Sequence, residues 1–141
     1  MKDFTLDSRL DNDCHLLAEA DGFSFLLHRN AEVLWLILVP HTAEHEFYRL
    51  TPDLQSRACE RISLLSRFLQ SHFDIDKINV ATIGNVVAQM HIHVIGRRHD
   101  DAYWPDLVWG RDFHKTYEKD QVGRIKQQLQ AFLQDNPLPN R

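Results

Sequence analysis

The stretch Gln89-Met90-His91-Ile92-His93-Val94-Ile95 alternates between polar and apolar side chains along its whole length. Successive side chains of a β-strand point to opposite faces, so this alternation predicts a strand with one buried face. The apolar residues share that face, which we expect to pack into the core. Gln89, His91 and His93 share the other face, where one amide and two imidazoles lie in a row.

Two imidazoles on one face have three interpretations. The first is nucleophilic catalysis. If a carbonyl accepts from the Nδ1–H of one ring, the Nε2 of that ring keeps a lone pair and can attack an electrophile. The second ring then donates a proton or a hydrogen bond. Alternatively, His91 and His93 bind a metal ion, with a further ligand from His28, His99 or Asp100. In the third interpretation both are surface residues of a half-exposed strand. The spacing alone leaves all three open.

The segments on either side predict an α+β domain with two main helices rather than a doubly wound parallel sheet. Up to the turn signal Asp21-Gly22 the sequence has no clear period, and we expect irregular structure there. We expect the same from Gly96 to about Lys115. A hydroxyl cap followed by proline predicts a helix start at Thr51. The further expected elements are strands at 23–27, 32–39 and 78–81, one helix from Thr51 to about His72, and a last helix from about Thr116.

Length and composition exclude several classes of protein. The 141 residues suit a single domain, here 1–141, since domains commonly hold ~100–200 residues. A net charge of −4 argues against a nucleic-acid coat protein. Two cysteines are too few for a disulfide framework or a cysteine-rich zinc site. The start lacks the apolar run of a signal peptide, and no stretch reaches the ~18–20 apolar residues of a membrane helix, so we expect a cytoplasmic protein without a membrane partner.

The motif Gln89–Ile95 resembles the signature of the histidine triad (HIT) family, which reads His-φ-His-φ-His-φ-φ with φ apolar. The preceding Gly84-Asn85-Val86-Val87 is similar to the family's Gly-(Gln/Asn)-x-Val lead-in. The apolar run Leu36–Pro40 and the strand Lys77–Val80 fall in the order of the family's elements. The tail Asp101–Gly110 resembles a short bacterial-type branch. The resemblance extends over nearly the whole chain.

The resemblance implies an α+β fold with a HIT-like antiparallel sheet and two main helices. It also implies a homodimeric nucleotide hydrolase or nucleotidyl transferase that needs no cofactor, and with the net charge of −4 we expect no nucleic-acid partner. His91 matches the middle histidine, the nucleophile that attacks the α-phosphorus and forms a nucleotidyl intermediate. His93 matches the third histidine, which contacts phosphate oxygens. The other matched positions are Asn85 near the phosphates, Asn79 near the sugar or phosphates, and Asn30 with His28 on the ribose-side loop.

Two positions depart from the family pattern. Gln89 replaces the first histidine, and an amide hydrogen-bonds but does not titrate near pH 7, so it can serve positioning but not proton transfer. Where many relatives carry Gly-His before the position of Leu36, this sequence has Leu34-Trp35, and we expect Trp35 to pack in the core. These departures keep two alternatives open: a nucleotide-binding regulatory protein with little turnover, and a metal-dependent hydrolase that uses His91 and His93 as ligands.

Overall fold

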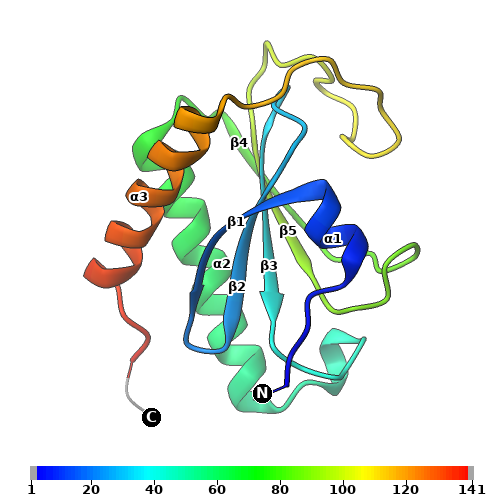
Figure 1. The fold of residues 1–141 in the computed structure, drawn as a ribbon, viewed down its shortest axis with the longest axis vertical. Helices are drawn as coiled ribbons and strands as arrows, with labels where there is room; N and C mark the ends of the chain where they lie inside the picture. The colour runs from blue at the N-terminus through cyan, green and yellow to red at the C-terminus, as the bar shows by residue number, and fades with distance from the viewer. Residues whose placement is uncertain (1–2, 140–141) are drawn as a thin grey trace.

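The computed structural model describes residues 3–139, which form one five-stranded antiparallel sheet with three α-helices (Figure 1). The strand order is β1-β2-β3-β5-β4. This arrangement confirms the predicted α+β fold. The elements are α1 (Ser8–Asp13), β1 (Cys14–Ala20), β2 (Phe23–His28), β3 (Leu34–Pro40), the 3₁₀ turn η1 (Phe47–Arg49), α2 (Pro52–His72), β4 (Lys77–Ala81), β5 (Ile92–Arg97) and α3 (Lys119–Asp135).

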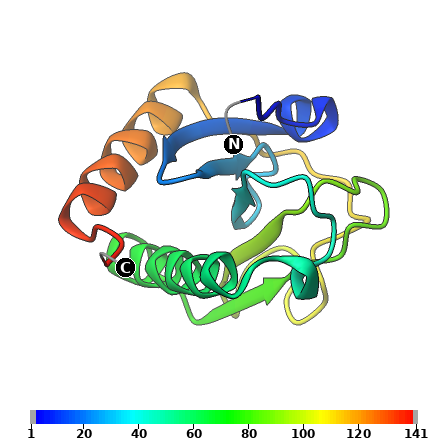
Figure 2. The ribbon, with the colours of Figure 1, turned by 90° about the horizontal axis from the view of Figure 1, so that it is seen from below.

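The two long helices cover one face of the sheet (Figures 1 and 2). The main apolar core lies between them and the sheet, and the apolar face of the His91 segment contributes Met90, Ile92 and Val94 to it, as the alternation predicts. Thr51 caps α2, its Oγ1 accepting from the backbone N–H of Leu54 at 3.1 Å. None of the helices among residues 3–139 is long and apolar enough to cross a membrane.

The opposite face of the sheet carries a second, smaller apolar cluster. It joins α1 and the loop that follows β5 to the central strands. Its buried members are Leu10, Cys14, Leu26, Val33, Trp35, Ile37, Val39, Ile95 and Val108. The packing predicted for Trp35 is confirmed, since the residue is buried within this cluster. The histidines therefore lie on a covered face rather than on an open surface.

The expectation of irregular structure before Asp21-Gly22 is wrong, because this segment forms α1 and β1. Asp21-Gly22 itself is the predicted turn, with both residues at positive φ, and it joins β1 to β2. The register of β1 against β2 shifts between Leu16 and Ala18. That irregularity exposes Leu16 and buries the adjacent Leu17. The sequence of β1 therefore lacks the regular alternation of apolar and polar residues that would predict a strand. The six residues of α1 are too few to show a helical stripe.

The strand predicted over Gln89–Ile95 begins only at Ile92 and continues to Arg97. The pairing of β3 with β5 ends at the pair Leu38–Ile92, and the pairing of β4 with β5 ends at Ala81–His93. Residues 89–91 therefore have no strand beside them, although Thr82 Oγ1 donates to the His91 carbonyl at 2.8 Å. Similarly, α3 begins at Lys119 rather than near Thr116, because a capping box at Glu118 sets its start.

Candidate active site

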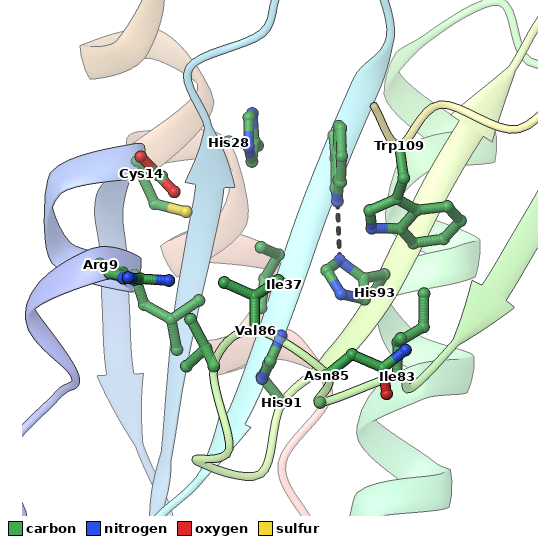
Figure 3. A pocket seen from close by; sticks show the side chains of 15 residues that line it. Arg9, Cys14, His28, Ile37, Ile83, Asn85, Val86, His91, His93 and Trp109 are labelled. Carbon is green, nitrogen blue, oxygen red and sulfur yellow. Dashed lines mark hydrogen bonds between the residues drawn. The ribbon is translucent and has the colours of Figure 1, made fainter. Parts of the chain in front are cut away.

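A pocket of about 290 Å³ opens on the covered face of the sheet, beside the two histidines (Figure 3). Its walls come from α1, the start of β1, the end of β2, the middle of β3 and the loop after β4. The residue that leads into β5, the start of β5 and the loop after β5 complete them. The lining residues are Arg9, Leu10, Asp13, Cys14, His28, Trp35, Ile37, Ile83, Gly84, Asn85, Val86, Val87, His91, His93 and Trp109. The pocket is mostly apolar, with a few polar groups converging near the histidines, a pattern typical of a small-molecule site.

His91 has the orientation required of a nucleophile. Its side chain is buried, and its Nδ1 lies 2.6 Å from the backbone carbonyl oxygen of Gln89. A carbonyl oxygen can only accept, so Nδ1 carries the proton and donates it to this bond. The lone pair of the neutral ring is therefore at Nε2, for which no partner exists among residues 3–139. The protein thus fixes the tautomer that can attack an electrophile.

His93 is held in the opposite tautomer by Trp35. The indole Nε1–H donates to His93 Nδ1 at 2.9 Å, the bond drawn as a dashed line in Figure 3. Because an indole can only donate, Nδ1 must be unprotonated and the proton of the neutral ring lies on Nε2. Burial, assisted by His91 and His28, lowers the pKa of His93 from 6.5 to about 3. His93 is therefore a neutral hydrogen-bond donor at physiological pH.

Aromatic rings surround this pair of imidazoles. The His91 and His93 ring centroids are 4.9 Å apart at 73°, and Trp109 meets His93 edge-on at 5.0 Å. Trp35 stacks on His28 at 4.1 Å and 10°. His28 Nδ1 accepts from the backbone N–H of Asn30 at 3.0 Å, and burial lowers the pKa of His28. The rings make this part of the pocket apolar, and an apolar environment strengthens the hydrogen bonds that a ligand would make here.

Residues 9–100 match the profile of the HIT domain. The chain belongs to the HIT family. It is 32% identical to a histidine triad protein from Sinorhizobium meliloti 1021, over 94% of this chain and 99% of that one, with a TM-score of 0.89. It is 36% identical to a histidine triad protein from Marinobacter aquaeolei VT8, over 95% and 98% of the two chains, with a TM-score of 0.88. No protein in the curated set matches significantly.

The HIT domain brings two of the four predicted substrate-contact residues into the histidine pocket. Asn85 lines it, and its side-chain amide has no hydrogen-bond partner among residues 3–139, so it is free to contact a ligand. His28 lines it from the end of β2. Asn30 is buried just outside: its Oδ1 accepts from Glu32 N at 2.9 Å and its Nδ2 donates to the Tyr103 hydroxyl at 3.1 Å.

Asn79 does not lie in this pocket. Its Oδ1 accepts from Arg97 Nη1 at 3.1 Å. Arg97 is 1% exposed and also makes two hydrogen bonds to Asp101, at 2.8 and 3.1 Å. The next residue, Arg98, is in contrast exposed and pairs with Asp74 and Asp100. The Arg97–Asp101 pair fixes the start of the loop that carries Trp109 to the pocket.

The predicted catalytic residue Gln89 also directs its side chain away from the histidine pair. Both polar atoms of its amide bond to the backbone of the N-terminal segment, at Thr5 and Asp7. Its backbone carbonyl, in contrast, orients His91. The structure therefore gives this residue one contact with the nucleophile, through the main chain.

The donor geometry gives little support to the metal interpretation of His91 and His93. Across residues 3–139 there is no group of three or more His, Cys, Asp or Glu side chains arranged to hold a metal ion. His99, suggested as a further ligand, is exposed beside Asp76, with its Nδ1 3.6 Å from the carboxylate. Each of the paired imidazoles already uses its Nδ1 in a hydrogen bond.

Several lining residues were not predicted from the sequence. Arg9, Asp13 and Cys14 belong to the segment expected to be irregular, so no pattern placed them near the histidines. Burial and the neighbouring Asp13 raise the pKa of the Cys14 thiol to about 12, and this thiol is therefore unreactive at neutral pH. Trp109 lines the pocket from the loop after β5, which lies in the second segment expected to be irregular.

The lowered pKa of His93 predicts a loss of stability in acid. Below pH 6.5 the unfolded chain binds a proton at this ring, whereas the folded protein does not until about pH 3. The free energy of unfolding is therefore highest above pH 6.5. It falls by about 1.4 kcal/mol per pH unit as the pH drops from 6.5 to about 3. Urea unfolding from pH 7 to pH 4 should show a shallower decline for His93→Gln than for the wild type. Parallel declines would contradict the assigned state of His93.

Proposed function

We propose that this HIT protein cleaves substrates of the form nucleoside-phosphate-X through a nucleotidyl intermediate on His91. Its family suggests nucleotide binding with hydrolase or transferase activity. The observation that carries the finer proposal is the pair of opposed tautomers: Nε2 of His91 offers a lone pair, and Nε2–H of His93 offers a hydrogen bond. X would be a second nucleotide, joined through a polyphosphate as in a dinucleoside polyphosphate, or an amine, as in a phosphoramidate.

In the first step, the lone pair of His91 Nε2 attacks the α-phosphorus. An N–P bond forms while the bond from phosphorus to X breaks, and its electron pair leaves with X, which takes a proton from solvent where it needs one. The carbonyl of Gln89 stabilises the positive charge that develops on the imidazole. In the second step, water attacks phosphorus, loses a proton to solvent and releases a nucleoside monophosphate, which returns the lone pair to His91.

Preorganised hydrogen-bond donors would stabilise the negative charge on the phosphoryl oxygens. His93 Nε2–H is one, and the unpartnered amide of Asn85 is a second. Donors of this kind commonly contribute ~3–4 kcal/mol each to transition-state stabilisation. The apolar part of the pocket would hold the nucleoside, against the stacked rings of His28 and Trp35. Gln89 contributes through its carbonyl, and the structure gives no support for a substrate contact by Asn79.

Trp35 supports the second candidate function, a nucleotide-binding regulatory protein with little turnover. The indole holds His93 in one neutral form, so His93 cannot shuttle protons during catalysis. Such a protein would keep the pocket, bind nucleotides and release products slowly. The two functions differ in turnover, not in the site that binds the ligand.

A panel of dinucleoside polyphosphates and nucleoside phosphoramidates tests the proposal. We expect the wild type to release a nucleoside monophosphate from at least one class, and chelator to leave the rate with phosphoramidates unchanged. Saturable binding without turnover across the panel would favour the regulatory protein. Loss of turnover in chelator, with stoichiometric metal in the purified protein, would favour the metal-dependent hydrolase.

The proposal also includes a homodimer and a cytoplasmic location, both taken from the sequence expectations. β4 is an edge strand of the sheet, and Val80 on it is 50% exposed. Ile83 and Val86, in the loop after β4, are also exposed and line the pocket. Sedimentation equilibrium measures the oligomeric state directly.

A further inference from the structure

The side chain of Gln89 ties down the N-terminal segment of the chain. Its Oε1 accepts from the backbone N–H of Asp7 at 2.8 Å, and its Nε2 donates to the backbone carbonyl of Thr5 at 2.9 Å. The amide therefore bonds to main-chain groups two residues apart, as a neighbouring strand would. We refer to residues 4–7 as the N-terminal strap.

Apolar contacts fix the strap at a second place. Phe4 stacks on the ring of His41, with centroids 4.3 Å apart and an interplanar angle of 19°. Phe4 and Leu6 also pack against the smaller apolar cluster. His41 is itself held, since its Nε2 lies 2.8 Å from the hydroxyl of the buried Ser24. The strap is thus attached to the same face of the sheet that carries the pocket.

The strap leads directly into α1, which forms one wall of the pocket through Arg9, Leu10 and Asp13 (Figures 1 and 3). The two ends of this short helix are held differently. Arg29 holds the C-terminal end, its backbone N–H donating to Asp13 O at 2.9 Å and its Nε to Asn12 O at 2.8 Å. Among residues 3–139, the only hydrogen bonds that join residues 4–9 to a distant part of the chain are the two made with the side chain of Gln89.

We infer that Gln89 is a positioning residue that holds the strap and α1 as a wall of the ligand pocket. Its backbone carbonyl orients His91 while its side chain holds the opposite wall, so one residue links the nucleophile to the ligand-binding surface. Gln89, at the position that matches the first triad histidine, thereby increases the affinity of the pocket for its ligand. The expected effect on nucleotide affinity rests on the proposed function, whereas the attachment of the strap by Gln89 does not.

The substitution Gln89→Met tests this role, because methionine keeps the length of the side chain and removes both hydrogen bonds. We expect hydrogen exchange in peptides covering residues 4–14 to accelerate by about tenfold, because the two hydrogen bonds that hold the strap are lost. The dissociation constants of the four nucleoside 5′-monophosphates, and KM for any substrate, should also rise, by up to the same factor. Any fall in kcat should be smaller than the rise in KM, because the substitution leaves the backbone carbonyl of residue 89 on His91 Nδ1.

A second pair of variants approaches the contact from the strap. Asp7 has φ −54°, which proline can adopt, so Asp7→Pro removes the N–H that donates to Gln89. The matched variant Asp7→Ala also loses the side-chain cap on Arg9 N but keeps that N–H. We expect Asp7→Pro to weaken binding more than Asp7→Ala, and Asp7→Pro combined with Gln89→Met to add little to either alone.

Exchange of residues 4–14 that is unchanged in Gln89→Met would overturn the inference, as would faster exchange with unchanged nucleotide affinity. A kcat lowered a hundredfold with KM and exchange unchanged would overturn it too, by placing the Gln89 side chain in the chemistry. If no nucleotide binds the wild type, the proposed function fails, and the exchange result alone decides whether Gln89 holds the strap.

Discussion

Replacing His91 with alanine is expected to lower kcat/KM by at least about a thousandfold while the fold survives. Among residues 3–139, His91 has the only Nε2 lone pair in the pocket that a backbone carbonyl orients, and the variant loses it. Nucleophilic groups of this kind carry most of the catalysed rate. The fold should survive because the side chain makes a single hydrogen bond and lines a pocket. Steady-state kinetics together with urea unfolding measure both quantities.

The matched control for this prediction is His91→Asn. An asparagine amide can donate to the Gln89 carbonyl from nearly the place of Nδ1, but it offers no nucleophile at the place of Nε2. Both variants should therefore be inactive. Activity within tenfold of the wild type in either one would refute the assignment of His91, provided that the variant is as stable as the wild type.

Replacing Trp35 with phenylalanine is expected to lower kcat by about 10–100-fold, the order of effect seen when a preorganised donor loses its orientation. Phenylalanine can still stack on His28, but it cannot donate to His93 Nδ1. The ring then populates both tautomers, because the donor that excludes a proton from Nδ1 is gone. Nitrogen-15 NMR of the imidazoles reports tautomer and charge directly.

Trp109→Phe provides the control for Trp35→Phe. Trp109 also contacts His93, edge-on at 5.0 Å, but makes no hydrogen bond to it. The same chemical change there should leave the His93 tautomer as it is in the wild type. Identical His93 spectra in the wild type and Trp35→Phe would show that the indole does not set the tautomer.

The sequence predicted the parts of the site that depend on local spacing. Alternation from Met90 onward placed His91 and His93 opposite the main core, and the Thr51-Pro52 cap located α2. The half-exposed surface interpretation of the two histidines is wrong, because they are 6% and 5% exposed. Their cover comes from α1 and from the loop after β5, and local spacing does not report contacts between distant segments.

What could not be predicted depends on pairing across the sheet. Trp35 was expected to pack, and it does, but its donation to His93 joins residues 58 positions apart. The register of β3 against β5, which pairs Trp35 with Ile95 and Ile37 with His93, brings the indole beside the imidazole. Burial of Arg97 likewise depends on Asp101 and Asn79 from two different segments. Such contacts follow from the fold rather than from any one motif.

Rapid-quench mass spectrometry of the intact protein during turnover tests the central claim most directly. With a cleaved nucleoside-phosphate-X substrate, the wild type should show a transient mass increase equal to the nucleoside monophosphate less one water, located on His91 by fragmentation. His91→Asn should show none. Turnover of the same substrate by wild-type protein without any adduct, or with the adduct on another residue, would contradict nucleophilic attack by His91.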